Sequence, residues 1–87
     1  MSIKEDMETV KELACMIPKY LSSAYDAEIV KKNLRPHLDT IKQYIKLTPD
    51  QEKVFTGRLH RKYEIQQLLE IRSELWKRYY RMKECSY

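Results

Sequence analysis

The chain is poor in the residues that break regular structure and in those that build reactive centres. Its 87 residues include one Gly, three Pro, two Cys and two His. A single Gly excludes the glycine-rich loops that cradle nucleotide phosphates, and the widely separated Cys and His residues have no zinc-binding spacing. No apolar run reaches the roughly 18 residues of a membrane span, and the N-terminus is too acidic and polar for a signal peptide. We therefore expect a cytoplasmic protein without a metal or cofactor.

The chain is rich in charged residues and in apolar side chains at helical spacing. Charged residues make up 34% of the sequence and hydrophobic residues 43%, a balance typical of a folded domain rather than of a disordered chain. The length suits one compact domain and is too short for two. The sequence therefore predicts a single helical domain over residues 1–87.

Capping residues and proline divide the first half of the chain into three short helices, predicted at about residues 3–17, 24–34 and 37–47. Ser2 precedes Glu5 by three residues, as in a capping box. Pro18 disfavours helix at the residue before it and ends the first helix. Ser23 is placed to cap the second helix, and Pro36 suits the first turn of the third.

The second half of the chain predicts one long helix, from about residue 49 to residue 84. Thr48 and Gln51 form a capping box around Pro49, and downstream only Gly57 weakens the helix, by about 1 kcal/mol relative to Ala. Such a helix would span roughly 50 Å, against roughly 30 Å for the diameter of a globule of this length. It must therefore bend at Gly57 or project. The predicted fold is all-α, a small bundle of three short helices packed on one long C-terminal helix.

The apolar arc of the long helix is wider than the seam of a two-stranded coiled coil. One line of this arc has near-heptad spacing and consists of Ile65, Leu68, Leu75 and Met82. We expect the short helices to cover one side of the arc and a second chain to cover the rest. This predicts a homodimer or a higher oligomer with those four residues in its seam.

Aromatic and basic residues are interleaved near the C-terminus. Tyr, Trp and Arg contribute most to protein interfaces, and five of them form the predicted partner-binding surface: Arg72, Trp76, Tyr79, Tyr80 and Arg81. Because no catalytic constellation is evident, we expect a protein that is not an enzyme. Its predicted function is that of a regulator or adaptor that binds a protein partner stoichiometrically, for example as an inhibitor.

A second function, the binding of nucleic acid, stays open. Residues 31–62 carry nine basic and three acidic side chains, whereas residues 1–30 carry three basic and six acidic ones. Cations neutralise phosphates and aromatic rings stack on bases. The residues expected to contact nucleic acid are Lys53, Arg58, Arg61, Lys62, Lys77, Arg78 and Arg81. Such binding would be weak, salt-sensitive and indifferent to base sequence.

The remaining reactive residue types are interpreted as exposed or structural. No spacing brings metal ligands to His37 or His60. Cys15 and Cys85 lie near opposite ends of the chain, and we expect both to be free thiols in a reducing compartment. The carboxylates of the first helix form an acidic face without the cleft that acid–base catalysis needs. The sequence therefore predicts no catalytic and no metal-binding residue.

Overall fold

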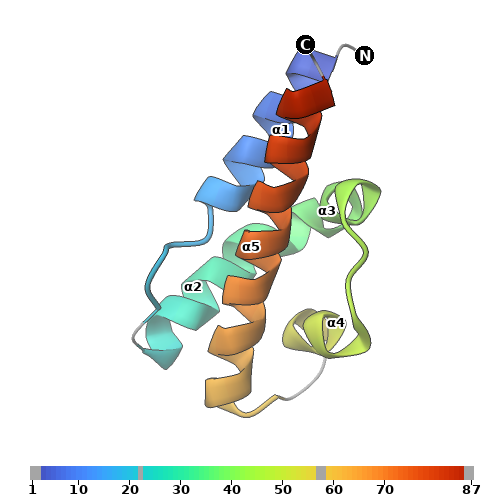
Figure 1. The fold of residues 1–87 in the computed structure, drawn as a ribbon. Helices are drawn as coiled ribbons and strands as arrows, with labels where there is room; N and C mark the ends of the chain where they lie inside the picture. The colour runs from blue at the N-terminus through green and yellow to red at the C-terminus, as the bar shows by residue number, and fades with distance from the viewer. Residues whose placement is uncertain (1–2, 22, 57–58, 86–87) are drawn as a thin grey trace.

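The computed structural model describes residues 3–21, 23–56 and 59–85, and within these ranges the regular structure is entirely helical. The elements are α1 (Ile3–Cys15), α2 (Ala24–Leu34), the 3-10 turn η1 (Arg35–His37), α3 (Leu38–Tyr44), α4 (Pro49–Thr56) and α5 (Arg61–Cys85). The long C-terminal helix packs against the shorter helices (Figure 1). The predicted all-α fold is confirmed.

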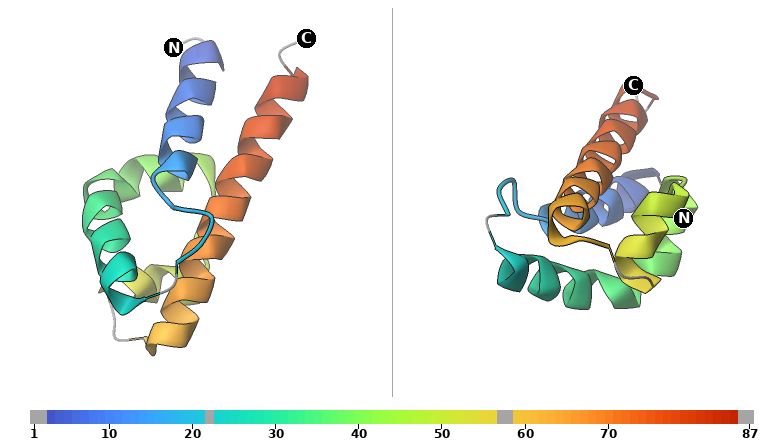
Figure 2. Two further views of the ribbon diagram at one scale, coloured as in Figure 1. Left: turned by 90° about the vertical axis from the view of Figure 1, so that its left-hand side faces the viewer. Right: turned by 90° about the horizontal axis from the view of Figure 1, so that it is seen from below.

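α5 is the longest element and runs along the length of the molecule. Its 25 residues span about 37 Å at 1.5 Å per residue, in a molecule that measures 42 × 22 × 18 Å. α1 lies beside the C-terminal half of α5 and α2 and α4 lie beside its N-terminal half (Figure 2). The end of α3 faces the C-terminal half of α5. Within the described parts of the chain, no helix is both long and apolar enough to span a membrane.

The helix starts follow the capping chemistry of the sequence. The Ser23 hydroxyl accepts a hydrogen bond of 3.2 Å from the backbone N–H of Asp26. At the start of α4, the Gln51 N–H donates to the Thr48 hydroxyl at 3.1 Å, and the Thr48 N–H donates to the Gln51 side chain at 3.0 Å. These bonds satisfy N–H groups that lack a partner inside the helix. The capping box predicted at Ser2 lies outside the described residues.

The prediction of one continuous helix over residues 49–84 is wrong. The helix ends at Thr56 and a new one begins at Arg61, with Leu59 and His60 in a non-helical connection. Gly57, where a bend was one of the two alternatives, and Arg58 lie outside the described residues. The break lets α4 pack against α5 as a separate helix, so that its Val54 and Phe55 enter the common core. A continuous helix would have left these apolar side chains without cover from the other helices.

One hydrophobic core joins all five α-helices and already includes the predicted oligomer seam. Leu68, Leu75 and Met82 are buried in it, and Ile65 packs against it half-buried. The premise that a second chain must cover this apolar line is wrong, because the shorter helices of the same chain cover it. The sequence argument assumed that the short helices could cover only one side of the long helix, whereas α1, α2 and α4 pack along different parts of α5.

Candidate functional site

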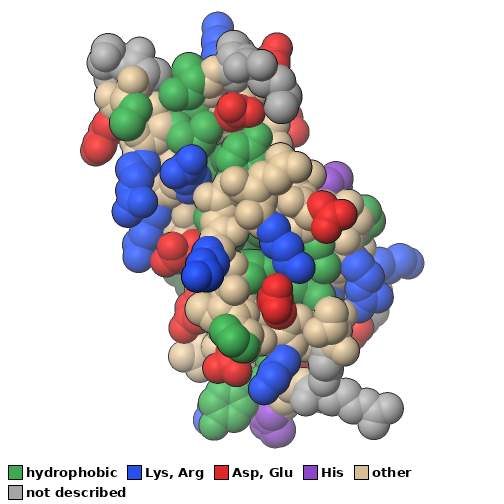
Figure 3. Space-filling view, turned by 90° about the vertical axis from the view of Figure 1, so that its right-hand side faces the viewer, with side chains coloured by type: hydrophobic (Ala, Val, Ile, Leu, Met, Phe, Trp, Pro, Cys, Tyr) green, Lys and Arg blue, Asp and Glu red, His purple; other side chains and the backbone are tan. Residues whose placement is uncertain are grey.

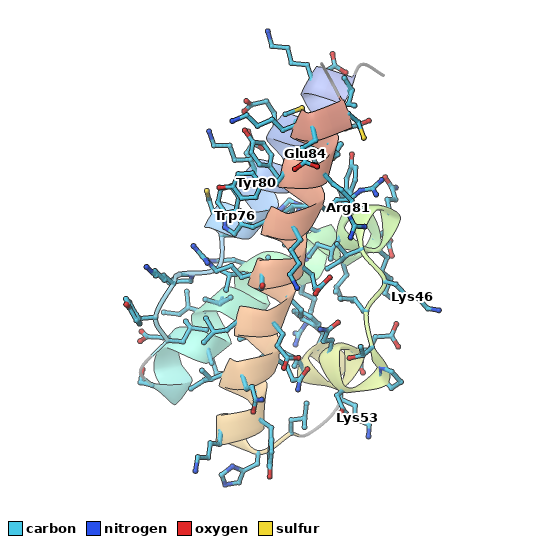
Figure 4. All side chains as sticks on the ribbon, in the orientation of Figure 1. Lys46, Lys53, Trp76, Tyr80, Arg81 and Glu84 are labelled. Atoms are coloured by element: carbon cyan, nitrogen blue, oxygen red, sulfur yellow. The ribbon has the colours of Figure 1, made fainter. Side chains whose placement is uncertain are left out.

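The five residues predicted to bind a partner do not form one surface. Trp76 and Tyr80 lie on one side of α5, and Arg81 lies on the opposite side (Figure 4). Residues four apart share a helix face, whereas adjacent residues diverge by about 100°. The structure therefore separates an aromatic surface from a basic one. Of the remaining two predicted residues, Tyr79 joins the aromatic surface, whereas Arg72 belongs to neither surface.

Arg72 holds the end of α1 against α5. Its half-buried guanidinium donates a hydrogen bond from Nε to the carbonyl oxygen of Ile17, at 3.2 Å. The Ile17 carbonyl follows the last turn of α1. At this end of a helix, backbone oxygens receive no hydrogen bond from an N–H group of the helix itself. Arg72 thus links two segments 55 positions apart in the sequence. Its contacts are those of a structural residue, and the sequence offered no way to distinguish it from an exposed arginine.

Three rings on α5 contact one another, and we call Trp76, Tyr79 and Tyr80 the aromatic cluster. The Trp76 and Tyr79 ring centroids lie 5.6 Å apart at an interplanar angle of 87°, and the Tyr79 and Tyr80 centroids lie 5.4 Å apart at 74°. Trp76 and Tyr80 stack, with centroids 6.0 Å apart and an angle of 30°. Edge-to-face and offset-stacked pairs are the favoured aromatic geometries. Each ring is therefore positioned by the other two.

The aromatic cluster is anchored on the core and open to solvent at one ring. Trp76 and Tyr79 are half-buried and pack against the core, whereas Tyr80 is 55% exposed. The indole Nε1 of Trp76 is buried, and no group in the described part of the chain accepts its hydrogen bond. Leaving a buried donor unsatisfied costs about 1–3 kcal/mol. The cluster therefore presents one exposed ring on a rigid base that contains an unsatisfied donor.

On the other side of α5 lies a cleft of about 210 Å³, which we call the basic cleft. It opens between the end of α3, the segment that follows it, and the C-terminal half of α5. Its lining residues are Tyr44, Ile45, Lys46, Glu74, Lys77, Arg78 and Arg81. Lys46 and Arg81 project to the same side of α5 (Figure 4). Figure 3 shows Lys and Arg side chains distributed over this face, with acidic side chains between them.

Tyr44 forms an inner wall of the basic cleft and ties it to α1. Its hydroxyl donates to Asp6 Oδ1 at 2.9 Å. Burial raises the pKa of Tyr44 above its ordinary value of 10.0, and the hydrogen bond to Asp6 and the charge of that carboxylate raise it further. The positive charge of Arg78 acts in the opposite direction. The phenol is therefore held neutral, as the donor of a hydrogen bond to Asp6.

The seven residues predicted for nucleic acid are only partly brought together. Lys77, Arg78 and Arg81 line the basic cleft, whereas Lys53 lies away from them on α4 (Figure 4) and is 4.0 Å from Asp50. Of the other three residues, Lys62 lies at the opposite end of α5 from the cleft. Arg58 and the side chain of Arg61 lie outside the part of the chain that the structure describes.

Sequence reasoning missed Lys46 as a member of the basic cleft. The residue lies in the short segment between α3 and α4. The capping box at Thr48 indicates that this segment is a loop, which is a signal available in the sequence. Which side of α5 the loop reaches depends on how the chain packs, and the sequence argument left open whether the long helix bends at Gly57 or projects.

A second charged group missed by the sequence argument joins α2 to α5. Lys31 Nζ lies 2.7 Å from a carboxylate oxygen of Glu28 and 2.5 Å from one of Glu64, and Glu64 is buried. Burial alone would lower the pKa of Lys31, but hydrogen bonds to the two carboxylates and their charges raise it. The hydrogen bond from Lys31 lowers the pKa of Glu28. This group stabilises the fold and lies at the opposite end of α5 from both surfaces.

The histidines and cysteines are placed apart. His37 is exposed in η1, and His60 Nδ1 accepts a 3.3 Å hydrogen bond from the Lys62 backbone at the start of α5. Cys15 and Cys85 are exposed free thiols. Over residues 3–21, 23–56 and 59–85, no group of three or more His, Cys, Asp or Glu could hold a metal ion.

The fold and these surfaces define the class of the molecule as an all-α protein in which shorter helices pack on one long C-terminal helix. Comparisons with protein-family models, curated proteins and solved structures found no match. A functional argument for this chain therefore depends on the geometry and chemistry of the aromatic cluster and the basic cleft.

Proposed function

We propose that this protein is a non-enzymatic regulator or adaptor, acting in the cytoplasm, that binds a protein partner stoichiometrically through the aromatic cluster. The observation that carries the proposal is the exposed Tyr80 ring stacked on the core-anchored Trp76. Rings that are already fixed in place lose little conformational entropy on binding, and Tyr and Trp dominate the energetics of protein interfaces.

The unsatisfied indole N–H supports the same proposal. Trp76 Nε1 is buried without an acceptor among the described residues, and its ring is in contact with the exposed Tyr80. A partner that packs against the aromatic cluster can bring a backbone carbonyl to this donor. Supplying that acceptor would recover free energy that the unbound protein loses, which favours a partner with an accessible main-chain segment.

An affinity-capture experiment with a matched pair of tyrosine variants tests the proposal. The immobilised protein, its Tyr80→Ala variant and its Tyr20→Ala variant are incubated with the same cell extract. Tyr20 is 80% exposed and lies outside the aromatic cluster, so it controls for loss of an exposed tyrosine. We expect a partner retained by the parent protein and by Tyr20→Ala and lost with Tyr80→Ala. Equal retention by both variants would contradict the proposal.

Nucleic-acid binding is the second candidate function, favoured by the convergence of Lys77, Arg78 and Arg81 in the basic cleft. Binding to phosphates weakens steeply with salt, whereas burial of aromatic surface does not. Gel shifts with duplex and single-stranded DNA at low and physiological salt therefore separate the two candidates. The Arg78→Glu and Arg81→Glu double variant should abolish a genuine shift, and Tyr80→Ala should leave it unchanged.

Self-association remains a separate prediction, although the residues of the seam that first suggested it pack in the core of a single chain. A second copy of the chain is itself a protein partner that the aromatic cluster could bind. Light scattering coupled to size exclusion measures the mass in solution. A mass twice that of the chain, returning to the monomer value in Tyr80→Ala, would identify the second copy as the partner.

A further inference from the structure

We propose that the basic cleft is a binding site for a small, multiply charged phosphate compound of the pyrophosphate class. Four of its seven lining residues are cationic, and only Glu74 among them is acidic. The cations come from two separate elements, with Lys46 on the segment after α3 and the others on α5. The fold therefore brings like charges together across a concave surface, where an anion would be surrounded by them.

The cationic groups are largely uncompensated. Within the described ranges, neither Lys46, Arg78 nor Arg81 is in an ion pair with a carboxylate. The acidic residue of the cleft is already engaged, since Glu74 lies 3.5 Å from Lys77 Nζ. Asp6, behind the wall of the cleft, accepts the hydrogen bond of the Tyr44 hydroxyl. Like charges held close together repel, and a bound anion relieves that repulsion.

The donor set fits phosphate better than a single carboxylate. Arg78 and Arg81 are three apart on α5, so their planar guanidinium groups lie on one face of the helix. Guanidinium groups bind phosphate oxygens through paired hydrogen bonds, and lysines add compact positive charge. A pyrophosphate offers several acceptor oxygens and more than one negative charge to these donors, whereas an isolated carboxylate offers two oxygens and one charge.

The surroundings of the cleft favour a compact ligand over a nucleic-acid backbone. The adjoining hollow along α5 shares Lys46, Glu74 and Lys77 with the cleft but adds the carboxylate of Glu70. Beyond Arg81 on the other side lies Glu84, which is also exposed. A polyanionic strand needs a continuous basic track, and here the positive field is interrupted at both ends. The cleft of about 210 Å³ suits one small anion instead.

Calorimetric titration with sodium pyrophosphate, in physiological salt, tests this inference on four proteins: the parent chain, Arg81→Gln, Lys46→Gln and Lys53→Gln. The first two variants remove exposed cleft cations, and the third removes an equal charge from α4, outside the cleft. We expect saturable 1:1 binding that weakens about tenfold in each cleft variant, as for loss of one charged hydrogen-bond donor. Lys53→Gln should bind like the parent protein.

Three results would overturn the inference: no binding of pyrophosphate by the parent chain, equal weakening by Lys53→Gln, or tighter binding of a short DNA duplex that pyrophosphate fails to displace. Circular dichroism on each variant establishes that the helices are retained, which is expected because the substituted side chains are exposed. Tyr80→Ala, on the opposite side of α5, should leave pyrophosphate binding unchanged. The inference can therefore fail or succeed independently of the proposed protein partner.

Discussion

The two halves of α5 have different environments within one continuous helix. The N-terminal half has α2 and α4 beside it (Figure 2). The C-terminal half packs against α1, faces the end of α3, and carries both the aromatic cluster and the basic cleft. Glu64, in the first turn of α5, is buried, while Tyr80 and Arg81 near its end are exposed. Among the described residues, the N-terminal half, which we call the enclosed half, has fewer exposed side chains. The C-terminal half, which we call the open half, is anchored on α1 and displays more side chains on that support.

Residues that stabilise the fold and residues that are free to bind a partner therefore differ in their distribution along α5. Substitutions in the enclosed half should lower the free energy of unfolding, and substitutions of the exposed rings and cations should change binding at nearly constant stability. The division is sharpest where a buried and an exposed residue of the same type can be compared on the same helix. The first two predictions that follow use such pairs, and all four run from the largest expected change in stability to the smallest.

The largest effect is expected for Leu68→Ala in the enclosed half. Leu68 has no exposed surface and lies at the centre of the core, so its truncation should cost about 3–5 kcal/mol through lost burial and the cavity left behind. Urea unfolding followed by circular dichroism measures the change. Leu69→Ala is the matched control, because its neighbouring side chain is only half-buried and should cost distinctly less. Equal costs would mean that the core is not centred on Leu68.

Glu64→Gln is expected to have the next largest effect. The substitution removes the buried carboxylate that faces Lys31 at 2.5 Å and leaves the lysine with Glu28, which is mostly exposed. A partly buried charge that loses one partner should destabilise the fold by about 2–3 kcal/mol. Glu70→Gln is the control on the same helix, since Glu70 is exposed. Urea midpoints that shift equally in both variants would refute a stabilising role for the link between α2 and α5.

Tyr44→Phe should have a smaller effect that depends on pH. Loss of the hydrogen bond to Asp6 should cost about 1 kcal/mol at neutral pH. Because the folded protein raises the pKa of Tyr44 above 10.0, the unfolded chain ionises first, and this contribution to stability is lost as the pH rises from about 10 through the folded pKa. Thermal unfolding between pH 8 and pH 11 should therefore show a shallower alkaline decline in the variant. An unchanged slope would contradict this assignment.

Most of the fold could be predicted from the sequence because its signals are local. Helix starts are marked by capping residues, Ser23 and Thr48, and by the positions of proline. Each capping hydroxyl accepts a hydrogen bond from the backbone N–H three residues later, and the structure has both hydrogen bonds. The break between α4 and α5 could not be predicted in the same way. A single Gly57 costs too little to end a helix, and the favourable term is burial of α4 against helices distant in the sequence.

The candidate site was less predictable than the fold because it depends on which side of α5 each neighbour occupies. Trp76 and Tyr80 are four residues apart, so helical spacing alone predicts that their rings are neighbours, and the two rings stack in the structure. The structural role of Arg72 depends on a carbonyl 55 positions away, and the place of Lys46 in the basic cleft depends on the path of the chain after α3. Both are consequences of packing, which residue types and short-range spacing do not encode.

The smallest change in stability is expected for Tyr80→Ala, and this variant tests the comparison most directly. Tyr80 is 55% exposed and stacks on Trp76, so its removal should cost only about 0.5 kcal/mol while uncovering part of the indole. Trp76 is the single tryptophan of the chain, and its fluorescence should move to longer wavelength as water reaches the ring. Tyr20→Ala, which removes a ring outside the cluster, should leave the emission unchanged. A cost approaching that of Leu68→Ala would make Tyr80 part of the supporting core, and the open half of α5 would then no longer separate recognition from stability.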